Sequence, residues 1–190
     1  MKLILASQSP RRKALLEQFG FSFSVEVFPA QEVSEGEPLA VARTNAMAKA
    51  LPVSEAFSEA LVLGADTIVT LAGRILGKPV DADDAFSMLR FLSGREHEVA
   101  TYVIMARSGQ VVREFSETTR VEFRELSSEE IKAYIATGEP FDKAGGYGIQ
   151  GYGGLLVKSI KGCYYNVVGL PIPSLAEHLR SLGIEVYTFI

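Results

Sequence analysis

Residues 61 to 71 read Leu-Val-Leu-Gly-Ala-Asp-Thr-Ile-Val-Thr-Leu, an apolar run with one carboxylate at its centre. This composition predicts a buried strand, and Ala72-Gly73 predicts a turn into a short strand over residues 74–76. An ionised Asp66 in such a run is costly unless it is hydrogen-bonded, paired or metal-bound. We therefore expect Asp66 to be a functional carboxylate, the alternative being a structural Asp satisfied by backbone amides.

Helices and strands alternate on both sides of this run. A long hairpin is expected where Ser108-Gly109 joins two β segments, and Ser127 with Glu130 forms a capping box. Periodicity and caps predict strands over residues 3–6, 21–27, 97–106, 111–123, 155–160 and 163–168, and helices over 10–19, 39–51, 81–92, 128–135 and 172–182. The hairpin among alternating elements implies an α/β fold with a mixed sheet and flanking helices.

Length and composition exclude several classes of protein. The 190 residues suit one domain or two closely packed lobes, and 47% hydrophobic with 22% charged residues is typical of a globular chain. The net charge of −4 argues against broad binding to nucleic acid or anionic lipid. Cys163 is a lone cysteine, no secretory segment is recognisable, and every apolar run is shorter than the ~18 residues of a membrane span. We expect a cytoplasmic protein that binds neither membrane nor nucleic acid.

The predicted first helix begins with a candidate anion site. Ser9 can cap it and Pro10 can take its first position, which leaves free backbone amides at the end. Arg11 and Arg12 oppose the helix dipole there by about 0.3 to 1 kcal/mol each, a mismatch that a bound phosphate would reverse. A solvated helix start paired with a surface carboxylate is the alternative.

Several other polar residues are weak signals on their own. Nine of the 17 glycines lie between Gly138 and Gly169, but residues 145–154 match neither a Walker loop nor a dinucleotide fingerprint. Lys78 and Lys143 could each contact phosphates or simply be solvated. On the residues alone Glu32 is a surface acid, and His97 and His178 lack partners at metal-ligand spacing and are expected to be structural or surface residues.

Several motifs in this order resemble the Maf family of nucleoside triphosphate pyrophosphatases. They are Leu-Ala-Ser-Gln-Ser-Pro-Arg-Arg at residues 5–12, Gly-Ala-Asp-Thr at 64–67, Gly-Lys-Pro at 77–79, Met-Leu-Arg-Phe-Leu-Ser-Gly-Arg at 88–95, Asp-Lys-Ala-Gly-Gly-Tyr-Gly-Ile-Gln-Gly at 142–151 and Val-Val-Gly-Leu-Pro at 167–171. The resemblance implies a mixed, elongated sheet with flanking helices, two lobes around a cleft as in inosine triphosphatase-like proteins, and a homodimer. We expect a single Maf-type domain over residues 1–190.

The same resemblance implies hydrolysis of the α,β phosphoanhydride of a nucleoside triphosphate, with a divalent cation such as Mg²⁺ or Mn²⁺. Asp66 matches the family's catalytic base and would share the metal with Glu32. The phosphate-binding set it implies is Ser9, Arg12, Lys78 and Lys143. Many members carry lysine in the second helix where this chain has Asn45, with Lys49 one turn later, which leaves open which of the two faces the cleft.

Substrate choice also follows from the resemblance. The branch acting on 7-methyl-GTP has Trp, Gln and Glu where this chain has Arg11, Thr67 and Gln150. A neutral Gln amide suits the O4 and N3–H edge of uracil or thymine, so the chain resembles the dTTP/UTP branch. The alternatives are a pyrophosphatase for 7-methyl-GTP or other noncanonical nucleotides, or a nucleotide-binding regulator of septum formation. Asp66 argues against the regulator, because a pure polyanion binder gains nothing from a buried carboxylate without a metal.

Overall fold

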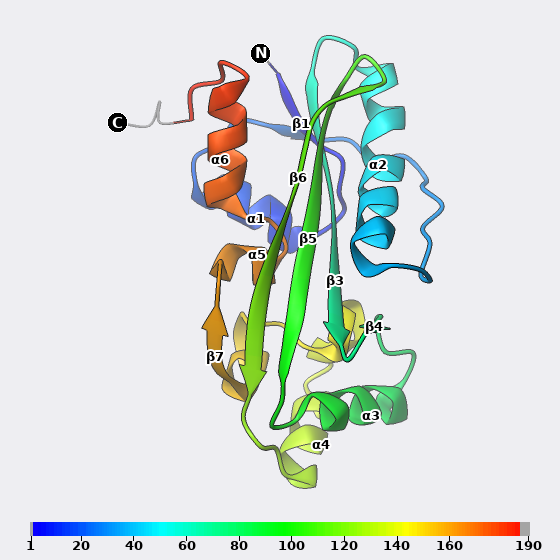
Figure 1. The fold of residues 1–190 in the computed structure, drawn as a ribbon, viewed down its shortest axis with the longest axis vertical. Coiled ribbons are helices and arrows are strands. Elements are labelled where there is room, and N and C mark those ends of the chain that lie inside the picture. Colours follow the sequence, from blue (N-terminus) through cyan, green and yellow to red (C-terminus); the bar gives the residue numbers. More distant parts are fainter. Residues whose placement is uncertain (1, 187–190) are drawn as a thin grey trace. The chain divides into compact units, whose positions relative to one another are not determined.

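The computed structural model describes residues 2–186, and strand β3 (Leu61–Leu71) lies inside its seven-stranded sheet. The strand order is β2-β1-β3-β5-β6-β7, with β4 also paired to β3 (Figure 1). β1 runs parallel to β2 and β3, whereas the β3–β4 and β6–β7 pairs are antiparallel. The predicted mixed sheet is therefore confirmed. The other strands are β1 (Leu3–Leu5), β2 (Ser24–Val25), β4 (Arg74–Leu76), β5 (Glu96–Arg107), β6 (Gln110–Phe123) and β7 (Val157–Lys161).

Helices account for most of the remaining elements, and the predicted α/β class is confirmed. The α-helices are α1 (Pro10–Gln18), α2 (Pro38–Ala56), α3 (Ala82–Leu92), α4 (Ser128–Ala136), α5 (Tyr164–Val168) and α6 (Ile172–Ser181). Short 3₁₀ helices follow α4: η1 (Glu139–Asp142), η2 (Ala144–Gly146) and η3 (Gly151–Leu156). No helix among residues 2–186 is long and apolar enough to cross a membrane.

The described residues divide into two compact units, and β3, β5 and β6 each contribute to both. Unit 1 comprises residues 2–66, 101–117 and 169–186, and its core packs small α2 residues such as Ala46 and Ala50 with Ile4, Val62 and Ile104. Unit 2 comprises residues 67–100 and 118–168, and its core includes residues of α3, α4 and β6 together with Tyr147. Each unit thus has a hydrophobic core of its own.

Two tight turns shape the strands as the sequence predicts. Ala72 and Gly73 both have positive φ, 52° and 76°, in the turn between β3 and β4. Ser108 (49°) and Gly109 (74°) repeat this pattern between β5 and β6. Paired positive φ values are typical of two-residue hairpin turns that match the right-handed twist of the strands. The hairpin expected at Ser108-Gly109 is confirmed.

The strand predicted over residues 163–168 is wrong, because residues 164–168 form helix α5. Thr119 causes the chain to turn here: its Oγ1 accepts from the Cys163 N–H and donates to the Cys163 carbonyl, both at 3.0 Å. Asn166 then donates to the Val99 carbonyl (2.9 Å) and to Thr119 Oγ1 (3.0 Å) from a fully buried position. The strand predicted over 21–27 is also too long, since only β2 forms there.

Gly64 allows α2 to approach β3 closely, which gives a stability prediction. A Cβ at Gly64 would lie 2.5 Å from the Ala46 carbonyl oxygen and 2.7 Å from Ala50 Cβ. We expect Gly64→Ala to lower the free energy of unfolding by about 1 to 3 kcal/mol, the usual cost of overpacking a core. Urea denaturation measures this, with Gly77→Ala as the control because a Cβ at Gly77 meets nothing within 4 Å. Equal midpoints for the two variants would contradict the packing account.

Candidate active site

The start of α1 is capped as the sequence predicts. Ser9 is the N-cap: its backbone is extended and its Oγ accepts from the Arg12 N–H, with Pro10 in the first turn. Ser7 Oγ accepts from the Ser9 N–H (3.2 Å) and from Arg12 Nη1 (3.1 Å). The predicted cap is confirmed. Ser7 was not among the predicted site residues, and its position two residues before the cap was the available signal.

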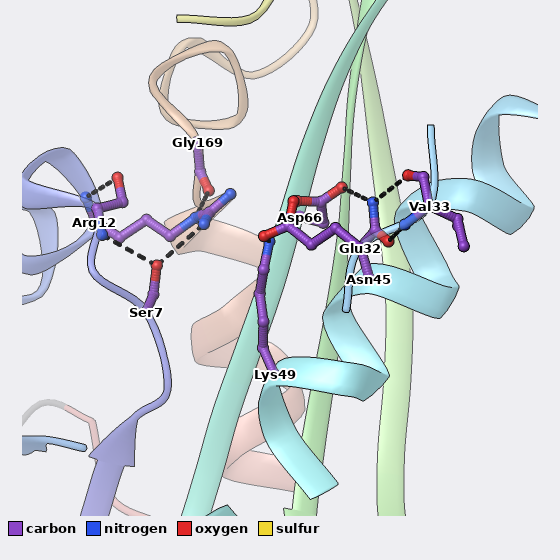
Figure 2. A network of polar contacts seen from close by, with 9 residues as sticks. Ser7, Arg12, Glu32, Val33, Asn45, Lys49, Asp66 and Gly169 are labelled. Carbon is purple, nitrogen blue, oxygen red and sulfur yellow. Dashed lines mark hydrogen bonds and ion pairs between the residues drawn. The ribbon is translucent and has the colours of Figure 1, made fainter. Parts of the chain in front are cut away.

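Arg12 is buried, with 8% of its surface exposed. Its Nε donates to the Gly169 carbonyl at 2.8 Å, so α1 is joined to the segment before α6 (Figure 2). Burial lowers the pKa of the guanidinium, and the negative charges of Asp66 and Glu32 act in the opposite direction. Arg12 is therefore a fixed cation that interacts electrostatically with the two predicted metal-site acids, Asp66 and Glu32.

Asp66 lies in β3 and is 9% exposed, yet both of its oxygens are hydrogen-bonded. Oδ1 accepts from Lys49 Nζ at 2.7 Å and Oδ2 accepts from Asn45 Nδ2 at 3.1 Å. Both donors project from α2 and are separated by one helical turn, so they reach the same strand (Figure 2). Asn45 and Lys49 therefore both contact the Asp66 carboxylate. The donors are side chains rather than the backbone amides of the structural interpretation.

Lys49 joins the two predicted metal-site acids. Its Nζ lies 3.1 Å from Glu32 Oε1 as well as 2.7 Å from Asp66 Oδ1, and its side chain is 16% exposed. A half-enclosed ammonium between two carboxylates offsets much of their mutual repulsion. Lys49 was an alternative to Asn45 for the residue that faces the cleft, but it was not among the predicted catalytic, metal or phosphate-binding residues.

Glu32 lies in residues 26–37, which form neither helix nor strand. Its neighbour Val33 is fixed to α2 by two hydrogen bonds: the Val33 N–H donates to Asn45 Oδ1 at 2.8 Å, and Asn45 Nδ2 donates to the Val33 carbonyl at 3.0 Å. Figure 2 shows Glu32 beside Asp66 and Lys49 as a result. Glu32 is thus a site neighbour of Asp66, although 34 residues separate them.

Asp66 and Glu32 suit a cation whose remaining ligands come from bound phosphates and water. Within residues 2–186 no group of three or more His, Cys, Asp or Glu side chains is arranged to hold a metal ion. Asp66 and Glu32 supply two carboxylates that already share one cationic group, Lys49. Mg²⁺ is commonly held by one or two carboxylates together with substrate phosphates and water, rather than by an all-protein cage. This donor set therefore suits a hard divalent cation that arrives with a polyphosphate.

Arg11 belongs to unit 1 with this cluster, whereas four other predicted site residues belong to unit 2. Thr67 directly follows Asp66 in β3, and Lys78 follows β4 with its side chain exposed. Lys143 Nζ donates to the Glu139 carbonyl (2.7 Å) and to Asp142 Oδ1 (2.5 Å). Gln150 is exposed. Ser9, Arg11, Arg12, Glu32 and Asp66 all belong to unit 1, and a joint role with the unit 2 residues stays a prediction.

The glycine-rich segment is organised by Glu139, which the sequence analysis did not single out. Glu139 Oε1 accepts from Tyr134 Oη (2.9 Å) and the Gly153 N–H (3.0 Å), and Oε2 accepts from the Tyr152 N–H (3.0 Å). A Cβ at Gly153 would lie 2.3 Å from the Gly148 carbonyl oxygen. The glycine is needed there because two backbone segments nearly touch, so this loop has a fixed shape around Lys143 and Gln150.

The histidines have structural surroundings, as expected. His97 is 2% exposed, its Nε2 lies 2.8 Å from Tyr147 Oη, and its ring packs edge-on against Phe123. Burial lowers the pKa of His97 to about 4, so the ring is neutral at pH 7. His178 stacks on Phe115. Neither ring contributes to the carboxylate cluster.

A family model described as Maf-like protein matches residues 2–182. A dTTP/UTP pyrophosphatase of Bacillus cereus is 49% identical over 187 residues, 97% of each chain, and one of Carboxydothermus hydrogenoformans is 47% identical over 187 residues, 96% of this chain and all of that one. Among solved structures, the Ham1 protein of Staphylococcus aureus has a TM-score of 0.48 at 15% identity, covering 65% of this chain and 72% of its own. A nucleoside-triphosphatase / dITP/XTP pyrophosphatase of Mycobacterium abscessus has a TM-score of 0.45 at 15% identity, covering 96% of both chains.

Proposed function

The chain belongs to the family of Maf-like proteins, and on that premise we propose that it is a nucleoside triphosphate pyrophosphatase that converts dTTP and UTP to the monophosphate and pyrophosphate. The observation that carries the proposal is the buried Asp66 carboxylate, paired through Lys49 with Glu32 and facing Arg12. The relatives named dTTP/UTP pyrophosphatase match nearly the full length of the chain, which supports the substrate class.

Asp66 is the general base of the proposed reaction. A water oxygen bonds to one phosphorus of the α,β anhydride, the bridging P–O bond breaks, and the water proton passes to the Asp66 carboxylate. The reaction needs no oxidant or second substrate. Lys49 and Asn45 orient the carboxylate through hydrogen bonds at 2.7 and 3.1 Å, so its position does not depend on the ligand. Such preorganisation removes the cost of orienting the base during the reaction.

The phosphates are bound by cationic and hydroxyl groups. Arg12 presents a guanidinium whose Nε and Nη1 are already anchored, and the α1 amides add a favourable dipole. Ser9, Lys78 and Lys143 complete the proposed set. Charge that develops on the phosphate oxygens in the transition state is best stabilised by such fixed groups.

A divalent cation, Mg²⁺ or Mn²⁺, would be held by Asp66 and Glu32. When bound, it neutralises phosphate charge and lowers the pKa of bound water. Lys49 keeps the same two carboxylates close together when no polyphosphate is present.

Base selection is assigned to Gln150, with Arg11 and Thr67. Gln150 is exposed within the glycine-rich segment, whose shape is fixed by Glu139. Its amide offers one donor face and one acceptor face, which complement the O4 and N3–H of uracil or thymine. The proposal extends to one Maf-type domain over residues 1–190 that acts as a homodimer in the cytoplasm.

The test is a panel of substrates with and without divalent cation. We expect dTTP and UTP to be hydrolysed well above CTP, GTP and 7-methyl-GTP, and only with Mg²⁺ or Mn²⁺, because two carboxylates and a polyphosphate repel one another without a cation. Full activity in excess chelator would contradict the metal role. Preference for 7-methyl-GTP or another noncanonical nucleotide would move the chain to a different branch, and nucleotide binding without turnover would favour a regulator.

A further inference from the structure

The Asn45 amide forms hydrogen bonds with Asp66 in β3 and with the backbone of Val33, the residue after Glu32. Its Nδ2 donates to Asp66 Oδ2 at 3.1 Å and to the Val33 carbonyl at 3.0 Å, and its Oδ1 accepts from the Val33 N–H at 2.8 Å. The side chain is buried, with 4% of the residue exposed. Figure 2 shows it between Asp66 and Val33. A terminal amide is the smallest group that can both donate to a carboxylate and form a reciprocal pair with a backbone.

The segment that Asn45 fixes has little other local order. Residues 26–37 form no helix or strand, and Val33 is 43% exposed, so its side chain does little to anchor it. The Glu32 side chain is 54% exposed and contacts the site through Lys49 at 3.1 Å. Because the Glu32 carboxylate is more than half exposed, solvent weakens this ion pair. The two part-buried hydrogen bonds between the Val33 backbone and Asn45 are the connection to α2 next to Glu32.

We propose that Asn45 is a positioning residue that fixes Glu32 relative to Asp66, and this inference rests on the proposed function. The amide nitrogen donates one hydrogen bond to Asp66 and one to the Val33 carbonyl, and the amide oxygen accepts from the Val33 N–H. Asn45 neither touches substrate nor transfers a proton in this account. Without it, Asp66 keeps Lys49, but the Glu32 segment samples other positions.

Amide exchange tests the positional part directly and needs no substrate. In Asn45→Ala the Val33 N–H loses its acceptor, so we expect its exchange to be at least ~10-fold faster than in the wild type, with helix α1 unchanged. The matched control is Ser54→Ala on the same helix, since Ser54 is likewise buried and its hydroxyl makes two hydrogen bonds, one to the Leu51 carbonyl (2.9 Å) and one from the Gly109 N–H (3.1 Å). The control should leave Val33 exchange at its wild-type rate.

Steady-state kinetics test the functional part. We expect Asn45→Ala to lower kcat for dTTP by ~10- to 100-fold, the usual effect of losing a residue that orients a metal ligand, while KM changes less than about threefold. The activity of Ser54→Ala should stay near wild type. Asn45→Leu, which fills the space without hydrogen bonds, should match Asn45→Ala and so separates positioning from a cavity effect.

A double-mutant cycle identifies the partner through which Asn45 acts. If Asn45 works by placing Glu32, then Asn45→Ala should cost little further activity once Glu32→Gln has been made, so the double variant should be at least ~3-fold more active than the product of the single effects. Independent effects, unchanged Val33 exchange, or an equal kinetic loss in Ser54→Ala would each overturn the inference. A wild type without any turnover would instead overturn the proposed function, and the positioning role with it.

Discussion

Asp66→Asn should lose at least ~100-fold in turnover of dTTP while the protein remains folded. The change keeps the size of the side chain but removes the charge that accepts a proton and holds a cation. An amide nitrogen in place of one carboxylate oxygen would face one of the two donors, Lys49 Nζ or Asn45 Nδ2, so at most one of those hydrogen bonds keeps its present form. Nucleotide should still bind, because Arg12 and the start of α1 are unchanged.

The stability of Asp66→Asn distinguishes a catalytic role of Asp66 from a purely structural one. Lys49 keeps Glu32 as a partner at 3.1 Å, so its ammonium is not left without a counter-charge. We expect the free energy of unfolding of Asp66→Asn to change by no more than about 1 kcal/mol. Melting temperature and turnover should be measured on the same sample, with Asp83→Asn on α3 as an exposed control. A destabilised variant with near-normal activity would mean that Asp66 is structural.

Arg12→Ala should impair both stability and activity. Truncation leaves the Gly169 carbonyl without its 2.8 Å donor and opens a cavity at a residue that is 8% exposed. We expect the free energy of unfolding to fall by about 2 to 3 kcal/mol. Turnover should fall ~10- to 1000-fold, since a fixed guanidinium near the phosphates is lost.

Arg12→Lys separates these two losses. It retains a cation but cannot reproduce the separate Nε and Nη1 hydrogen bonds to Gly169 and Ser7. We expect stability between that of the wild type and Arg12→Ala, with turnover still reduced by ~10-fold or more. Urea denaturation and steady-state kinetics with dTTP measure both. Unchanged kinetics in Arg12→Ala would mean that the phosphates bind elsewhere.

Local signals were sufficient to predict much of the fold. The Ser9 cap and the Ser127–Glu130 capping box are both present, because each depends on residues within one helical turn. The Ser108-Gly109 hairpin is present for the same reason. The strand predicted over 163–168 failed because its conformation depends on Thr119 and Val99, which are distant in sequence. Tertiary hydrogen bonds overrode β-propensity there.

The site shows the same division. The unusual position of Asp66 was visible in the sequence, since a carboxylate inside an apolar strand needs compensation. The approach of Glu32 to Asp66 could not be predicted from the sequence. Residues 26–37 carry no periodic pattern, and Val33 in this segment is held by the Asn45 amide. Helical spacing alone places Asn45 and Lys49 on one face, but only packing of α2 on β3 shows that both reach Asp66. The roles of Lys78, Lys143 and Gln150 stay predictions.

Product analysis by ³¹P NMR of the wild-type protein with dTTP and Mg²⁺ tests the central claim most directly. A pyrophosphatase that cleaves the α,β anhydride must release thymidine monophosphate and pyrophosphate in equal amounts, with no free orthophosphate at early times. We expect these two products from the wild type. Their formation should be abolished by chelator and should be at least ~100-fold slower in Asp66→Asn. Release of thymidine diphosphate with orthophosphate, or no turnover of any triphosphate in the presence of a divalent cation, would contradict it.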